Sequence, residues 1–196
     1  MPRAWAQAKA PVILVVGDSL SAEYGVKRGM GWIALLQERL KTAKRPETMI
    51  NAGISGDTTA GGRSRLPALL AQHKPAIVII ELGGNDALRG MPLSSTLANL
   101  TAMAQMSKKA GARVLLVGME MPPSYGARYT QHFRDLFTTV ANQEKTALVP
   151  FLLAGVADRP DALTLFQSDR IHPNEIAQPL LADNVWPTLQ KMLPKI

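Results

Sequence analysis

The chain has no cysteine among its 196 residues. Disulfide bonds, thiolate nucleophiles and cysteine-ligated zinc or iron sites are therefore excluded, while the redox compartment stays open. Long apolar runs are missing too. The longest, Pro75 to Leu82, has the length of a strand and falls far short of the roughly 20 residues that cross a bilayer. We therefore expect no stable membrane insertion.

Several nucleotide, metal and hydrolase motifs are also absent. The glycine-rich segment Gly53 to Gly62 lacks the Gly-Lys-Ser/Thr ending of a phosphate loop, and no G-x-G-x-x-G follows the first apolar run. The spacing of metal ligands does not occur, nor does the G-x-S-x-G elbow of the α/β-hydrolases. We expect neither a cofactor nor a metal ion.

Positive charge is in excess but scattered. The formal net charge is +7, Lys and Arg do not gather into one stripe, and aromatic residues make up only 5% of the chain. This distribution disfavours a nucleic-acid interface. It indicates a basic surface with some attraction for anionic substrates or lipid headgroups.

The length and the 46% hydrophobic fraction predict one domain over residues 11–196. Residues 1–10 contain Ala4-Trp5-Ala6 and Ala6-Gln7-Ala8, small-x-small patterns like those at a signal peptidase site. The apolar h-region of a signal is missing. Two interpretations stay open for this segment, the remnant of an export leader or a frayed terminus.

Strands and helices are predicted to alternate. Apolar and β-branched runs typical of buried parallel strands are Val12 to Val16, Thr48 to Ile50, Ala76 to Leu82, Val114 to Val117 and Ala147 to Val149. Helical spacing of apolar residues occurs in the segments Trp32 to Leu40, Leu66 to Leu70, Leu97 to Met106, about Tyr129 to Glu144, and Ile176 to Leu193. We expect Pro187 to kink or end the last helix. The alternation predicts an α/β fold, a three-layer α/β/α sandwich with a parallel sheet.

Polar, glycine-containing turns follow three of the predicted strands directly. They are Gly17-Asp18-Ser19, Asn51-Ala52-Gly53 and Gly83-Gly84-Asn85-Asp86. Ligands of such sheets bind outside the carboxyl ends of the strands, so these turns are expected to converge on one site.

A serine nucleophile needs a base, and the chain has three histidines. His73 and His132 are interpreted as solvated or structural residues. His172 lies in Asp169-Arg170-Ile171-His172, where the carboxylate can orient the imidazole and leave its other nitrogen for Ser19.

Each piece also has a structural interpretation when taken alone. Asp18 and Ser19 can cap backbone amides in an ordinary turn. Gly53 can serve a turn that requires positive φ, and Asn85 can cap its own turn. The functional interpretation has Gly53 and Asn85 donating hydrogen bonds to an oxyanion. The four pieces together, each placed at a strand end or in a late loop, favour catalysis.

These four blocks resemble those of the GDSL, or SGNH, hydrolases over about Pro11 to Trp186. The resemblance implies a flavodoxin-like sheet of five parallel strands and a serine esterase without a cofactor. It implies Ser19 as nucleophile, His172 as base and Asp169 as its partner. The oxyanion hole would be formed by the amides of Ser19 and Gly53 and the side chain of Asn85.

Within that family the chain is most similar to small bacterial arylesterases that also act as acyl-CoA thioesterases and lysophospholipases. The resemblance implies a small acyl ester or thioester substrate and a periplasmic or secreted location. It also implies a mobile loop, Ala87 to Pro92, whose Leu88 and Met91 cover the acyl chain, with Met121 and Pro122 as further substrate contacts. A local hydrophobic patch is the alternative interpretation of Leu88 and Met91. The alternatives are a carbohydrate O-deacetylase with the same triad and a non-catalytic binding protein. The residues predict no particular oligomeric state.

Overall fold

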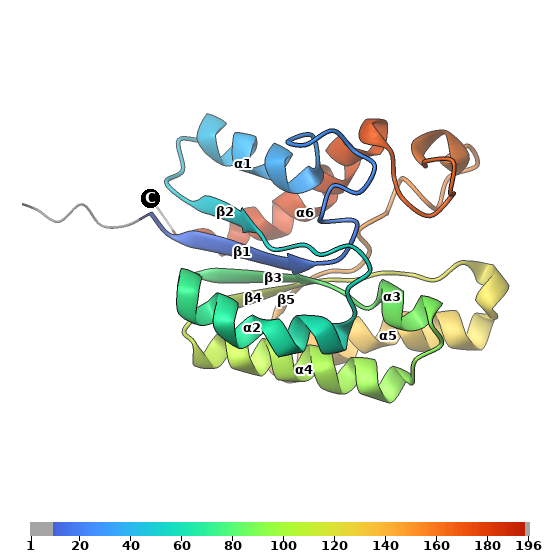
Figure 1. Cartoon of the computed structure of the whole chain (residues 1–196), viewed down its shortest axis with the longest axis horizontal. Coiled ribbons are helices and arrows are strands. Elements are labelled where there is room, and N and C mark those ends of the chain that lie inside the picture. Colours follow the sequence, from blue (N-terminus) through green and yellow to red (C-terminus); the bar gives the residue numbers. More distant parts are fainter. Residues whose placement is uncertain (1–9, 195–196) are drawn as a thin grey trace, which may run out of the picture.

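The computed structural model describes residues 10–194. Residues 1–10, for which a leader remnant and a frayed terminus were both left open, thus fall almost entirely outside the described residues. One sheet runs through the described part of the chain, and helices cover both of its faces (Figure 1).

All five expected strands are present and every pairing between them is parallel. The sheet has the order β2-β1-β3-β4-β5, which is the flavodoxin-like order. Both the predicted sandwich and the implied sheet are therefore confirmed. The bounds are β1 Val12–Gly17, β2 Thr48–Asn51, β3 Ile77–Glu81, β4 Arg113–Val117 and β5 Ala147–Val149.

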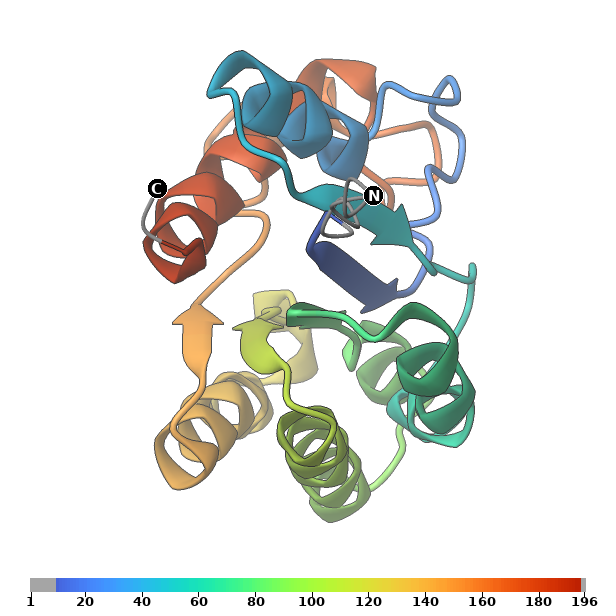
Figure 2. The same cartoon turned by 90° about the vertical axis from the view of Figure 1, so that its left-hand side faces the viewer.

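The helices lie in two layers (Figure 2). Helices α1 (Trp32–Thr42) and α6 (Gln178–Met192) pack together on one face. Helices α2 (Thr59–His73), α4 (Leu93–Lys109) and α5 (Ala127–Glu144) cover the other. The short helix α3 (Gly84–Leu88) follows β3 directly, and the 3-10 turns are η1 Pro123–Tyr125, η2 Ala162–Leu165 and η3 Glu175–Ala177.

The central strands form the core because both of their faces are covered. Ile13 to Val16 of β1 are fully buried, and Ile77 to Ile80 of β3 are at most 1% exposed. Edge strand β2 is less buried along its length. The continuous apolar runs of β1 and β3 are thus explained by their central position.

Two local predictions need correction. Pro187 does not end the C-terminal helix, because α6 continues to Met192. Val185 and Leu189, on either side of the proline, are fully buried, and this packing offsets the backbone hydrogen bond that a proline removes. The predicted loop Ala87 to Pro92 is likewise partly helical, since Ala87 and Leu88 belong to α3.

Among residues 10–194, no helix combines the length and the apolar character that crossing a bilayer requires.

Candidate active site

The carboxyl ends of β1 and β3 bring the predicted polar turns together, at the point where the strand order reverses. Ser19 follows β1 by two residues, and His172 reaches it from the loop ahead of α6. The distance from His172 Nε2 to Ser19 Oγ is 2.9 Å, and the distance from His172 Nδ1 to Asp169 Oδ2 is 2.7 Å. The structure therefore places a hydroxyl, an imidazole and a carboxylate in one hydrogen-bonded chain, the arrangement needed to activate a serine.

Asp169 is held by the backbone of its own loop. Its Oδ1 accepts hydrogen bonds from the backbone N–H of Ile171 at 2.9 Å and of His172 at 3.0 Å. These bonds, the one from His172 first, together with the His172 ring, lower the pKa of Asp169 to about 2. Arg170 adopts a positive φ of 59° at the tip of this turn. Asp169 is thus ionised throughout the neutral range and fixes one side of the imidazole.

The loop after Ser19 packs against the other side of the histidine. The ring centroid of Tyr24 lies 4.4 Å from that of His172. Gln167 ties the two loops together, because its Nε2 donates to the carbonyl of Tyr24 at 2.8 Å and its backbone N–H donates to the carbonyl of His172 at 2.8 Å. Sequence reasoning did not identify Tyr24 or Gln167, since neither stands in a recognisable spacing to the site.

Gly53 approaches the Ser21 backbone so closely that a side chain cannot be accommodated. An added Cβ would lie 2.7 Å from the backbone N of Ala22 and 2.9 Å from the backbone C of Ser21. The φ of Gly53 is not positive, so the interpretation as a positive-φ turn is wrong. Its N–H donates to Asn51 Oδ1 at 2.9 Å. A substrate oxyanion would have to replace that acceptor.

Asn85 points toward the nucleophile turn. Its Nδ2 donates to Asp18 Oδ2 at 3.0 Å, so the interpretation of Asn85 as the cap of its own turn is wrong. The capping interpretation of Asp18 is correct, since its Oδ1 accepts from the N–H of Leu20 at 3.0 Å. An amide nitrogen carries two hydrogens, and Asn85 has one left for another acceptor.

A second carboxyl, which sequence reasoning missed, lies behind this turn. Glu81 ends β3, is fully buried, and accepts a hydrogen bond from Ser21 Oγ at 2.7 Å through Oε2. Burial, and then the charge of Asp18, raise its pKa well above the usual range. Burial also raises the pKa of Asp18, to about 6. A signal existed in the sequence, because Glu81 is the one charged residue in an apolar run predicted to be buried.

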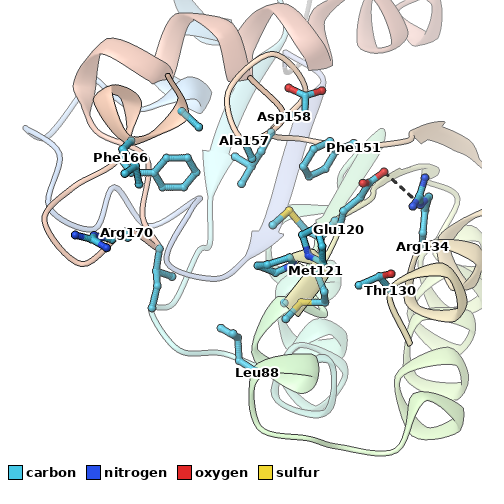
Figure 3. Close-up of a pocket in the computed structure, with 18 of the residues that line it drawn as sticks. Leu88, Glu120, Met121, Thr130, Arg134, Phe151, Ala157, Asp158, Phe166 and Arg170 are labelled. Carbon is cyan, nitrogen blue, oxygen red and sulfur yellow. Dashed lines mark ion pairs between the residues drawn. The ribbon is translucent and has the colours of Figure 1, made fainter. Parts of the chain in front are cut away.

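Beside the site lies a largely apolar cavity of about 630 Å³ (Figure 3). Three of the predicted substrate contacts, Leu88, Met121 and Pro122, line it, whereas Met91 does not. Met91 follows α3 beyond Leu88 and is 37% exposed. Further apolar lining that the sequence did not reveal comes from Met119, Phe151, Leu153, Leu163, Phe166 and Ile171.

Charged groups lie in one wall of the cavity. Arg134 Nε of α5 lies 3.4 Å from Glu120 Oε1 (Figure 3). Gly84 and Ile171, the neighbours of Asn85 and His172, also contribute to the lining. The cavity therefore opens next to the candidate active site. No group of three metal-ligating side chains occurs among residues 10–194.

Comparisons with known proteins agree with this geometry. Residues 15–178 match the model of the GDSL-like lipase/acylhydrolase family. Esterase TesA of Pseudomonas aeruginosa is 54% identical over 187 residues, covering 95% of this chain and 92% of that protein. Thioesterase 1/protease 1/lysophospholipase L1 of Escherichia coli is 40% identical over 186 residues, covering 95% and 86%.

A crystal structure of TesA superposes with a TM-score of 0.89 at 53% identity, covering 93% of this chain and 99% of the other. The family match spans most of the chain, and the fold and the hydrogen-bonded serine are those that an acyl hydrolase requires. The chain therefore belongs to the GDSL-like lipase/acylhydrolase family and is an ester hydrolase.

Proposed function

We propose that this hydrolase cleaves carboxylic esters and thioesters of apolar acyl groups through an acyl-enzyme on Ser19. The observation that carries the proposal is the hydrogen-bonded chain from Ser19 through His172 to Asp169. His172 takes the proton of Ser19 as the hydroxyl attacks the carbonyl and returns it to the departing alcohol or thiol. Water, activated by the same histidine, then releases the acid.

The negative charge on the carbonyl oxygen needs donors during both steps. The proposed donors are the amides of Ser19 and Gly53 and the side chain of Asn85. In the free protein the Gly53 N–H donates to Asn51 Oδ1. When the substrate binds, the Gly53 N–H exchanges Asn51 Oδ1 for the oxyanion of the substrate, so this N–H has a hydrogen-bond acceptor before and during the reaction.

The acyl group is proposed to occupy the cavity beside Gly84 and Ile171. Its apolar lining favours alkyl or aryl acyl groups, whereas a sugar O-deacetylase would need a polar or aromatic platform for the ring. The thioester part of the proposal is supported by the similarity to the Escherichia coli relative, which is named a thioesterase.

Hydrolysis of p-nitrophenyl esters from acetate to palmitate tests the proposal. The Ser19→Ala variant should retain less than about a thousandth of the parent rate, and a fluorophosphonate should add once to the parent and not to this variant. Ser55→Ala, which changes an exposed serine at the same sheet edge, is the matched control and should remain active. Turnover by the Ser19→Ala variant would refute the nucleophile assignment. Turnover of sugar acetates alone would favour the O-deacetylase.

We also propose that the protein is exported. Support comes from the small-x-small patterns within residues 1–10. Intact mass of the protein expressed from its native reading frame tests this, because export predicts a cleaved product and an uncleaved product would contradict it.

A further inference from the structure

Two carboxyl groups are buried directly behind the turn that carries Ser19. Glu81 is fully buried and Asp18 is 3% exposed. The backbone of Gly17 packs directly against Ser21 and Glu81, since a Cβ on Gly17 would lie 2.3 Å from Ser21 Oγ and 2.8 Å from Glu81 Oε2. The glycine thus allows the glutamate and Ser21 to meet beneath the nucleophile turn.

The two carboxyls are unequally supplied with hydrogen-bond donors. Asp18 has a donor on each oxygen, the N–H of Leu20 and the side-chain amide of Asn85, both at 3.0 Å. Glu81 has a long contact of 3.4 Å from the Asp18 N–H and a bond of 2.7 Å to Ser21 Oγ. Its other oxygen, Oε1, is buried and has no partner among the described residues. Burying an ionised carboxylate that has one oxygen without a hydrogen-bond partner costs free energy. The Ser21 hydroxyl can donate or accept a hydrogen bond, so it can pair with the acid form of Glu81 as well as with the anion.

The surrounding charges do not supply Glu81 with a counter-ion. The guanidinium of Arg65 reaches the carbonyl of Gly17 at 3.2 Å but is paired with Asp57 at 2.8 Å. His172 favours the charged form of Asp18, which Asp57 opposes, whereas the charge that acts on Glu81 is the negative one of Asp18. Charge complementarity therefore favours an anion at Asp18 and not at Glu81.

We propose that Glu81 is a neutral carboxylic acid in the working enzyme and positions the nucleophile turn, while Asp18 carries the single negative charge of the pair. Glu81 then acts through Ser21 and the Asp18 amide, two residues after and one before Ser19. Asp18, left as the only anion, holds the side chain of Asn85. The raised pKa of Glu81, caused by burial and by Asp18, agrees with this assignment.

The isosteric variant Glu81→Gln tests the protonation state. A buried acid whose pKa is raised in the folded chain keeps its proton while the unfolded chain loses it, so unfolding releases a proton and stability falls as pH rises above the ordinary carboxyl range. The Glu81→Gln variant has no such proton. Its Tm should equal that of the parent near pH 4.5 and exceed it by about 3 °C or more at pH 8.

Glu47 provides the matched control, because it is similarly buried but forms an ion pair with Arg45. It is 3% exposed, and Arg45 contacts its two oxygens at 2.6 and 3.1 Å. Glu47→Gln should therefore lower the Tm at pH 8, in the opposite direction to Glu81→Gln. Infrared spectroscopy in D₂O adds a direct measurement: the parent should show the carbonyl stretch of a protonated carboxyl at pH 7, and Glu81→Gln should abolish it.

Kinetic measurements on two Glu81 variants test whether Glu81 positions the nucleophile turn or only fills space in the core. Glu81→Gln should keep kcat/KM within about threefold at pH 7, whereas Glu81→Ala, which leaves Ser21 without a partner, should lower kcat at least tenfold with KM little changed. A Tm loss at pH 8 in Glu81→Gln like that of Glu47→Gln, or a protonated-carboxyl band that survives this variant, would overturn the proposal. The Tm and infrared measurements do not depend on hydrolysis, so they remain decisive even if the acyl-enzyme proposal fails.

Discussion

Asp169, the outer carboxyl, is linked to Ser19 through His172, whereas Asp18 and Glu81, the inner pair, adjoin the turn that carries Ser19. The pKa values of the outer carboxyl and the inner pair shift in opposite directions. Asp169 lies in a partly exposed loop and has a lowered pKa of about 2. Asp18 and Glu81 lie beneath the turn, and burial raises the pKa of both. Backbone N–H groups lower the pKa of Asp169 in its partly exposed loop. Burial raises the pKa of Asp18 in spite of a donor on each of its oxygens, and it raises that of Glu81 further from the ordinary value because one oxygen of Glu81 has no partner among the described residues. The balance between burial and hydrogen-bond donors, more than proximity to the serine, therefore decides which of these carboxyls carries charge.

The difference suits different tasks. Asp169, the outer carboxylate, must be ionised during catalysis to stabilise the imidazolium of His172, and its backbone N–H donors ensure this. Glu81, which fixes the turn from within, holds it better as a neutral acid, because a second buried anion would repel the negative charge of Asp18.

The largest expected effect on kcat comes from removing the negative charge of Asp169. Asp169→Asn keeps the shape of the side chain but loses the charge and favours the wrong imidazole tautomer. We expect kcat to fall by about 10²–10⁴ with the fold intact. Steady-state kinetics beside Asp161→Asn, which changes an exposed aspartate of the same region, measures the effect. A loss below tenfold would mean that the outer carboxylate does not support the base.

The next largest effect tests the link between the inner pair and the chemistry. Asn85→Ala removes the proposed oxyanion donor and should lower kcat by about 10²–10³ with little change in KM. Asn142→Ala, which changes an exposed residue near the C-terminal end of α5, is the control and should retain parent kinetics. A rise in KM at unchanged kcat would instead assign Asn85 to ground-state binding.

Residue types and their order sufficed to predict the sheet and the outer half of the site. The apolar runs around Val12 to Val16 and Ala76 to Leu82 need no tertiary information, and Asp169 and His172 are close in sequence. Glu81 stands out in the sequence as the one charged residue of an apolar run, but its partner Ser21 could not be predicted, because the two residues meet only through the pairing of β1 with β3. The course of α6 through Pro187 and the exclusion of Met91 from the cavity likewise depend on packing that no local pattern specifies.

A smaller effect is expected at Asp18. In the Asp18→Asn variant the amide oxygen can still accept one hydrogen bond, but the charge-assisted contact to Asn85, worth about 1.5–3 kcal/mol, is lost. We expect kcat/KM to fall by about tenfold at pH 7. The parent should also lose activity as pH falls through about 6, where Asp18 becomes protonated, and the variant should depend less on pH there. Identical acid limbs in the two proteins would show that Asp18 does not titrate in this range.

The smallest effect concerns stability and completes the contrast between the two regions. The pKa of Asp169 is depressed in the folded chain, so its contribution to stability is present above its ordinary value of 3.8 and is lost as pH falls through about 2. This is the reverse of the trend expected for Glu81. Because the Asp169 side chain is 35% exposed, solvent screening keeps the contribution small, and Asp169→Asn should lower the Tm by only about 1–2 °C at pH 7. Thermal unfolding of parent and variant from pH 2 to pH 8 should show the two curves converging at the acid end. Tm curves that instead diverge on acidification would mean that the backbone N–H groups of Ile171 and His172 do not stabilise the Asp169 anion. The lowered pKa of Asp169 would then need another cause.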